Sequence, residues 1–172
     1  MSGQRIVLAS GKYLSFVVVD GYELVERINC AGVVVVIAVT DNRELVLVEQ
    51  FRKPLEANVI ELPAGLVSDT EASRAEAVED AAMRELEEET GFIANSLEFV
   101  AEWPTSAGLT SETVAVFKAH GLKRIGRGGG DPTEKITVHV ISVDGVDAWL
   151  KKKVSQGCIV DPKVFAALYL CR

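Results

Sequence analysis

The alternation of apolar and polar residues along the chain predicts many short strands and few helices. Leu14–Val19 and Tyr22–Ile28 flank Asp20-Gly21, a dipeptide typical of a tight β-hairpin turn. Val33–Val39 is a continuous run of mostly β-branched residues, which predicts a strand buried on both faces. Leu45–Phe51 has the composition of a further strand. The first third of the chain is therefore expected to be β-structure.

The rest of the pattern mixes strands with helices. Further strands are expected at Asn58–Leu62, Leu97–Trp103, Glu112–Ala119 and Lys135–Val143. Helices are expected at Arg74–Glu89, Asp144–Val154 and Asp161–Leu170. The last of these begins with Asp161 as N-cap and Pro162 at the first helical position. A mixture of this kind predicts an α/β (α+β) fold.

Composition narrows the class of protein. A chain of 172 residues is long enough to bury one ordinary core. The net charge of −7 argues against a nucleic-acid partner, because no basic stripe is present to neutralise phosphates. The three cysteines are widely spaced, which argues against a disulfide framework or a zinc site. The N-terminus lacks the apolar region of a signal peptide, and the longest apolar run, Ala31 to Val39, is too short to span a membrane, so we expect a cytoplasmic protein without a membrane partner.

Candidate chemistry is concentrated in the first predicted helix. Glu85, Glu88 and Glu89 stand at i, i+3 and i+4, so their side chains leave one helix face. Like charges at this spacing destabilise a helix by roughly 0.2–0.5 kcal/mol per pair. A bound cation would offset this repulsion, so the cluster indicates a cation site. Carboxylates are ligands that Mg2+ and Mn2+ prefer. The alternative is an ordinary solvated, glutamate-rich face.

The residues around this helix resemble a known signature. Arg84-Glu85-Leu86-Glu87-Glu88-Glu89-Thr90-Gly91-Phe92 fits the second half of the box G-x5-E-x7-R-E-U-x-E-E-x-G-U of the Nudix hydrolase family, where U is aliphatic or aromatic. In the first half, five residues separate Gly65 from Glu71, as the box requires, but twelve residues separate Glu71 from Arg84 where the box has seven. Counting back from Arg84 selects Glu76, so an insertion leaves open whether Glu71 or Glu76 is the early box glutamate.

Segments outside the box resemble the ADP-ribose pyrophosphatase and nucleoside diphosphate sugar hydrolase branch of this family. The segment Gly21-Tyr22-Glu23-Leu24-Val25-Glu26-Arg27 is similar to the part of that branch in which an aromatic stacks on the nucleobase and an arginine meets substrate oxygens. The resemblance thus implies substrate-binding roles for Tyr22, Glu23 and Arg27. It also implies that Arg52 contacts the diphosphate of the substrate. The alternatives are a surface aromatic for Tyr22 and a solvated charge for Arg27.

The resemblance also implies an architecture. It predicts a Nudix α/β/α sandwich with a mixed sheet in residues 39–172, and a small antiparallel β lobe in residues 1–38. In that branch the N-terminal strands are exchanged between two subunits, so a homodimer is expected. Ser106-Ala107-Gly108 departs from the Ser-Pro-Gly that the branch often has, which leaves the choice between ADP-ribose and another nucleoside diphosphate sugar open.

Two later glutamates are candidates for the catalytic base. The segment from Pro132 to Val140 resembles the place where a mobile loop delivers a late glutamate to the metal site. Glu134 is the residue that matches, and the resemblance implies that it acts as general base, as a further metal ligand, or as both. Glu112 is the second candidate, and in that branch the matching glutamate more often positions substrate. The preceding Gly126-Arg127-Gly128-Gly129-Gly130 is either a phosphate cradle or an ordinary loop. His139 and His120 are interpreted as structural and turn residues.

The resemblance and the residues together predict a mechanism. Ions held by Glu85, Glu89 and the Ala64 carbonyl, Mg2+ or else Mn2+, would neutralise a diphosphate while water attacks one phosphorus, activated by the ion or by Glu134. Arg84 would orient the carboxylates by pairing with one of them, with Glu88 as the candidate. The products would be a nucleoside monophosphate and a sugar phosphate. A Nudix enzyme for a dinucleoside polyphosphate or an oxidised nucleoside triphosphate, and a non-catalytic nucleotide-binding module, are the alternatives.

Overall fold

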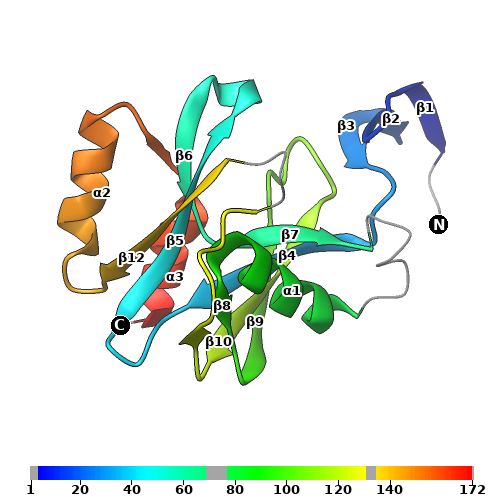
Figure 1. Cartoon of the computed structure of the whole chain (residues 1–172). Coiled ribbons are helices and arrows are strands. Elements are labelled where there is room, and N and C mark those ends of the chain that lie inside the picture. Colours follow the sequence, from blue (N-terminus) through cyan, green and yellow to red (C-terminus); the bar gives the residue numbers. More distant parts are fainter. Residues whose placement is uncertain (1–3, 69–76, 131–134, 172) are drawn as a thin grey trace.

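The structure is a computed structural model that describes residues 4–68, 77–130 and 135–171 (Figure 1). Its elements follow one another along the chain as β1 (Arg5–Ser10), β2 (Leu14–Val19), β3 (Tyr22–Arg27), β4 (Gly32–Ala38), β5 (Glu44–Arg52), the 3-10 helix η1 (Lys53–Leu55), β6 (Ala57–Glu61), β7 (Ala64–Val67), α1 (Val78–Thr90), β8 (Phe92–Ile93), β9 (Ser96–Pro104), β10 (Thr113–His120), β11 (Lys123–Arg124), β12 (Ile136–Ser142), α2 (Val146–Ser155), β13 (Ile159–Val160) and α3 (Pro162–Cys171).

Two four-stranded sheets form the centre of the molecule. Their strand orders are β7-β4-β10-β9 and β12-β5-β6-β13, and both combine parallel with antiparallel pairs. One apolar cluster packs α2 and α3 against β4, β5, β6 and β10, and a second packs α1 against β4, β7 and β10. In Figure 1, α1 lies away from α2 and α3, on the other side of these sheets. The expected α/β/α sandwich with a mixed sheet is therefore confirmed.

β4 is the strand on which both clusters meet. Val35 and Ile37 face the cluster with α2 and α3, whereas Val34 and Val36 face the cluster with α1. All four are at most 1% exposed, as the continuous apolar run predicts. β4 pairs with β7 and β10, so it belongs to one of the two central sheets. The division of the chain into an N-terminal lobe and a main domain stays a proposal. Its boundary would lie before β4 and not after it, at residue 38.

A separate three-stranded antiparallel sheet holds β1, β2 and β3 and stands at the side of the molecule (Figure 1). The predicted hairpin is confirmed, because Val19 pairs with Tyr22 across the turn. Asp20 and Gly21 both have positive φ, 50° and 83°, which is the conformation that a two-residue hairpin of this kind requires. β1 was not predicted, and all of its residues are exposed.

The other predicted strands are confirmed with ends shifted by one residue, and β7 was missed because Ala64–Val67 is too short to show alternation. The helix expected from residue 74 is described from Val78, and residues 74–76 lie outside the described ranges. α3 begins as predicted, with the Lys163 amide donating to Asp161 Oδ1 at 2.7 Å. Within the described residues, no helix has both the length and the apolar character that a membrane crossing needs.

Candidate functional site

The acidic face of α1 lies against β7. Glu89 is only 5% exposed, and its Oε2 accepts a hydrogen bond from the backbone amide of Ala64 at 3.0 Å. Glu85 lies so close to Gly65 that a Cβ atom built on this glycine would overlap the Glu85 carboxyl group. Two residues of one helix face thus bring their carboxylates to the same short segment of strand. The absence of a side chain at Gly65 is what permits this approach.

Arg84 ties the carboxylates to the strand. Its Nη1 donates to Glu85 Oε1 at 2.8 Å and to Glu88 Oε2 at 3.0 Å. Its Nη2 donates to the backbone carbonyl of Leu66 at 3.1 Å. The Glu85 side chain is 14% exposed and that of Glu88 is 54% exposed, so the guanidinium links one enclosed carboxylate to one at the surface. Sequence analysis named the contact with Glu88, but not those with Glu85 and Leu66.

The donor set fits a hard divalent cation. Glu85 and Glu89 offer carboxylate oxygens beside the Ala64 backbone, and Mg2+ usually takes only one or two carboxylates together with water and substrate phosphates. Within the described residues, no group of three or more His, Cys, Asp or Glu side chains is arranged to hold a metal ion by itself. A site of this composition would be completed by the phosphates of a substrate.

A second group of predicted residues gathers where β3 meets the loop before β10. The Tyr22 hydroxyl donates to the Gly108 carbonyl at 3.2 Å, and the Val25 amide donates to the Leu109 carbonyl at 2.9 Å. Arg27 Nε donates to Glu112 Oε1 at 2.6 Å, and this hydrogen bond raises the pKa of Arg27. Two residues that were each named as substrate-binding candidates are therefore bonded to one another although they lie 85 positions apart in the sequence.

A pocket of about 260 Å³ adjoins this pair. Its lining residues come from the end of β3, the start of β4 and the start of β10: Glu26, Arg27, Cys30, Ala31, Gly32, Val33, Ser111, Glu112 and Thr113. Val33 is paired in the sheet with Leu66, whose carbonyl accepts from Arg84. The pocket and the carboxylates of α1 are thus connected through one pair of neighbouring strands, β4 and β7.

The other predicted site residues are distributed as follows. Arg52 Nε donates to Glu61 Oε2 at 2.7 Å, at the end of the strand that leads to Ala64. Glu23 is exposed on β3. Glu134, the candidate base, lies outside the described residues, as do Glu71 and Glu76. The structure therefore brings Arg84, Glu85, Glu88 and Glu89 together with Ala64, and Arg27 together with Glu112.

The glycine-rich segment is not a phosphate cradle in its described part. The amide of Gly129 donates to the Glu89 carbonyl at 2.8 Å, and the amide of Gly130 donates to the Glu88 carbonyl at 3.0 Å. A cradle needs amides that point at the ligand, whereas these two point at the end of α1. The segment is not a simple hairpin loop either, because it packs on the helix.

His139 is part of a polar cluster with Glu49 and Lys153. Its Nε2 lies 2.8 Å from Glu49 Oε2, which also accepts from Lys153 Nζ at 2.6 Å. Burial raises the pKa of Glu49, but the hydrogen bonds from Lys153 and His139 outweigh it and leave the pKa below its ordinary value. The cluster joins β5, β12 and α2, as expected for a structural histidine. His120 ends β10 beside Gly121.

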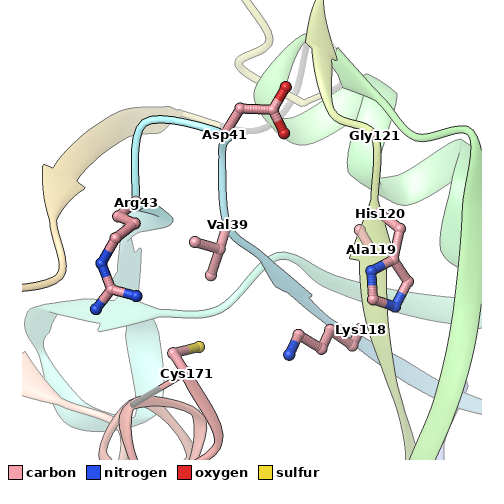
Figure 2. A pocket seen from close by; sticks show the side chains of 8 residues that line it. All are labelled: Val39, Asp41, Arg43, Lys118, Ala119, His120, Gly121 and Cys171. Carbon is pink, nitrogen blue, oxygen red and sulfur yellow. The ribbon is translucent and has the colours of Figure 1, made fainter.

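Another pocket, of about 250 Å³, lies where the β4–β5 turn meets the ends of β10 and α3 (Figure 2). The Lys118 amine and the Cys171 thiol point into it. Burial raises the pKa of Cys171, while Lys118 and Arg43 act in the opposite direction. None of the predicted site residues lines this pocket.

Sequence reasoning did not assign several residues that shape the site. Leu66 and Glu61 stand on either side of Ala64 and Gly65, and sequence analysis gave neither of them a contact. Gly108 and Leu109 hold β3 through backbone carbonyls, and backbone contacts leave no signal in side-chain identity.

Comparisons with known proteins agree with this geometry. The chain is 36% identical over 129 residues to the methanol dehydrogenase activator of Bacillus methanolicus, covering 74% of this chain and 67% of that protein. It is 43% identical over 97 residues to the ADP-ribose pyrophosphatase of Bacillus subtilis (strain 168), covering 56% of this chain and 50% of that protein. The second match thus spans half of the relative's length.

The fold has a solved counterpart, the crystal structure of an ADP compounds hydrolase, with a TM-score of 0.70 and 21% identity over 97% of this chain and 89% of the other. The family model described as NUDIX domain matches residues 31–155, which include β4, the carboxylates of α1 and the part of the pocket lining that comes from β4 and the start of β10. The chain belongs to the NUDIX domain family.

Proposed function

We propose that the chain hydrolyses the diphosphate bond of ADP-ribose or a related nucleoside diphosphate sugar, giving a nucleoside monophosphate and a sugar phosphate. The observation that carries this proposal is the pair of enclosed carboxylates, Glu85 and Glu89, held against β7 within a NUDIX domain. Identity to an ADP-ribose pyrophosphatase of 43% supports the substrate class. The departure at Ser106-Ala107-Gly108 keeps other nucleoside diphosphate sugars among the candidates.

NUDIX enzymes generally need divalent metal ions, and here we propose Mg2+, with Mn2+ as the second candidate. Glu85, Glu89 and the Ala64 carbonyl would hold the ion, which when bound neutralises diphosphate charge and polarises the bond to be cleaved. Arg84 supports this role through its bonds to Glu85 and Glu88, because a guanidinium that contacts two carboxylates fixes their orientation.

The substrate would lie between these carboxylates and the pocket beside Arg27. Tyr22 and Glu23 would contact the nucleoside, while Arg27 and Arg52 would meet the diphosphate oxygens. In the structure, Arg27 donates to Glu112 and Arg52 donates to Glu61. Substrate oxygens would therefore share the two guanidinium groups with these carboxylates or displace the carboxylates. Glu134 is proposed as the base that takes the proton from water, and Glu112 as the residue that positions the substrate.

We also propose a homodimer formed through the N-terminal sheet. β1 is exposed along its whole length, with Ile6 44% and Leu8 53% exposed, and Phe16 on the neighbouring strand is 37% exposed. Adjacent exposed apolar side chains of this kind mark interaction surfaces.

The cysteines form no disulfide in the described structure, which is in keeping with the reducing cytoplasm as the proposed location.

A second candidate function follows from the relative that covers 74% of the chain, a methanol dehydrogenase activator. The chain would then raise the activity of a dehydrogenase. Adding the purified chain, with Mg2+, to methanol dehydrogenase of Bacillus methanolicus and measuring the rate tests this candidate. Activation by the wild type that Glu85→Gln abolishes would support it, and an unchanged rate would remove it.

The proposed function is tested with a panel of substrates. ADP-ribose, other nucleoside diphosphate sugars, a dinucleoside polyphosphate, an oxidised nucleoside triphosphate and coenzyme A are each incubated with the chain, with and without Mg2+, and the released phosphomonoester is counted. Cleavage of ADP-ribose or another nucleoside diphosphate sugar, dependent on Mg2+, is the expected result. Preference for another member of the panel would change the substrate, and binding without cleavage would favour a nucleotide-binding module.

A further inference from the structure

The C-terminal end of α1 receives hydrogen bonds from residues far along the chain. The last carbonyls of a helix have no partner within it and must find one elsewhere. The Glu87 carbonyl accepts from the Gly91 amide at 2.8 Å, which is the ordinary local cap. The next two carbonyls, of Glu88 and Glu89, instead accept from Gly130 and Gly129. We call residues 128–130 the glycine clamp.

The clamp approaches the helix backbone more closely than any residue with a side chain could. Gly128 has φ +68°, and a Cβ atom built on it would lie 2.6 Å from Thr90 Cα. Gly91 has φ +73°, and a Cβ atom there would lie 2.8 Å from the Gly128 amide nitrogen. Glycine at both positions therefore allows two backbones to meet, which larger residues would prevent by steric overlap and by their unfavourable φ.

The end of α1 needs such support because its own sequence destabilises it. A helix C-terminus carries a partial negative charge, which favours cations and disfavours carboxylates. α1 has no basic residue in its last turn, and four glutamates stand between positions 85 and 89. Both repulsion between these carboxylates and the helix dipole would promote fraying at this end. The clamp opposes that fraying by occupying the carbonyls of Glu88 and Glu89.

We propose that the glycine clamp is a positioning element for the metal ligands of α1. This inference rests on the proposed function, because Glu85 and Glu89 are metal ligands only there. Glu89 has its side chain bonded to the Ala64 amide and its carbonyl bonded to the Gly129 amide. The same residue is thus held at both ends, and loosening the clamp releases the backbone that aims the carboxylate. Gly128 is the residue on which the close approach depends.

The first test uses the wild-type chain and Mn2+ alone. Because coupling is reciprocal, a clamp that aids metal binding must itself be stabilised by the metal. Hydrogen exchange at the Gly129 and Gly130 amides should slow by up to roughly 100-fold when free Mn2+ is raised to about 100 times its Kd. It is read by NMR after exchange is quenched and the paramagnetic Mn2+ is removed with chelator. The Gly157 amide donates to the Val154 carbonyl at the end of α2 and is the matched control, with no expected change. Equal exchange with and without bound Mn2+ at Gly129 and Gly130 overturns the proposal.

The second test changes one glycine at a time. Gly128→Ala should weaken Mn2+ binding, measured by calorimetry without substrate, by roughly 10- to 100-fold, the range seen when groups that orient metal ligands are lost. Two other glycines serve as controls. Gly157→Ala introduces comparable backbone strain at φ +92°, but its new Cβ has no atom within 4 Å. In Gly126→Ala the nearest atom to the new Cβ lies at 3.8 Å. Both should bind Mn2+ as the wild type does. Unchanged affinity in Gly128→Ala contradicts the proposal, and if that variant does not fold, the exchange measurement decides.

The two proposals fail in different ways. A wild-type chain that binds Mn2+ and shows the coupled exchange, yet cleaves no member of the substrate panel, would overturn the proposed function and leave the clamp intact. A chain that cleaves ADP-ribose with Mg2+, but whose Gly129 and Gly130 amides exchange equally with and without Mn2+, would support the proposed function and overturn the role of the clamp.

Discussion

The backbone amide of Ala64 donates to the Glu89 carboxylate at 3.0 Å, which joins β7 to the last turn of α1. A carboxylate that is 5% exposed would be costly to bury without hydrogen bonds. This bond also brings the carboxylate to the residue whose carbonyl is the third proposed metal ligand. The strand therefore determines where the helix can present its charge, and the proposed metal site is a property of the contact between the two elements.

Metal binding should depend on this contact. Glu85→Gln and Glu89→Gln remove one negative charge each while keeping the shape of the side chain, so the fold should survive. Relief of repulsion between neighbouring carboxylates should even stabilise the metal-free chain slightly, by a few tenths of a kcal/mol. The rise in Tm that Mg2+ produces in the wild type should be largely lost in both variants.

Glu87→Gln is the control for this measurement, because Glu87 is exposed on the same helix and has no predicted ligand role. Its rise in Tm with Mg2+ should equal that of the wild type. An undiminished rise in both Glu85→Gln and Glu89→Gln would show that the assignment of ligands is wrong.

Glu134 and Glu112 should separate in steady-state kinetics. Glu134→Gln should lower kcat on the order of 10²- to 10⁴-fold with little change in KM, as expected for a lost general base. Glu112→Gln should chiefly raise KM, because Glu112 is bonded to Arg27 and borders the pocket. The opposite pattern, with Glu112 controlling kcat and Glu134 almost silent, would transfer the role of base to Glu112.

The Glu49 cluster should make stability depend on pH. The pKa of Glu49 lies below its ordinary value, so the folded state binds the proton less readily than the unfolded state does. The stabilisation is therefore complete above pH 4.5, the ordinary value, and is lost as the pH falls through the folded-state pKa. Glu49→Gln should lower the free energy of unfolding by about 1–3 kcal/mol at pH 7, measured by urea denaturation.

This difference between wild type and Glu49→Gln should shrink as the pH is lowered below 4.5. Glu87→Gln, a surface change, should stay within about 0.5 kcal/mol of the wild type at pH 7. A difference for Glu49→Gln that is the same at neutral and acidic pH would contradict the role given to Lys153 and His139.

The proposed homodimer should depend on the N-terminal sheet. Sedimentation at micromolar concentration should give about twice the chain mass of 18.6 kDa. Leu8→Glu should shift the chain to a monomer, because it places a charge on exposed β1. Phe165→Glu changes an equally exposed apolar residue on α3 and should leave the dimer intact. A dimer that is lost only in Phe165→Glu would place the interface on α3. A wild-type chain that is monomeric and fully active would contradict the proposed homodimer.

Local pattern was sufficient for the parts of the site that depend on periodicity. The i, i+4 spacing of Glu85 and Glu89 places both on one face of any helix, and the continuous run of β4 requires burial on both sides. The hairpin turn at Asp20-Gly21 follows from the positive φ that this dipeptide accepts. These features need no knowledge of the rest of the chain.

Contacts between distant segments were beyond such reasoning. Arg27 and Glu112 were both named, but their ion pair depends on how β3 docks on the loop before β10. The glycines at 129 and 130 offered two interpretations, and the structure selects a third, because the unpaired carbonyls at the end of α1 accept their amides. Backbone partners of this kind carry no signature in residue type.

The most direct test of the account is the hydrolysis of ADP-ribose by the wild type, Glu85→Gln, Glu89→Gln and the control Glu87→Gln, each assayed at equal concentration with Mg2+ and with excess chelator. The account predicts cleavage to AMP and ribose phosphate by the wild type and by Glu87→Gln only when Mg2+ is present, with most of the activity lost in Glu85→Gln and Glu89→Gln. Cleavage that persists in both of these variants, or that continues without a divalent ion, would contradict it.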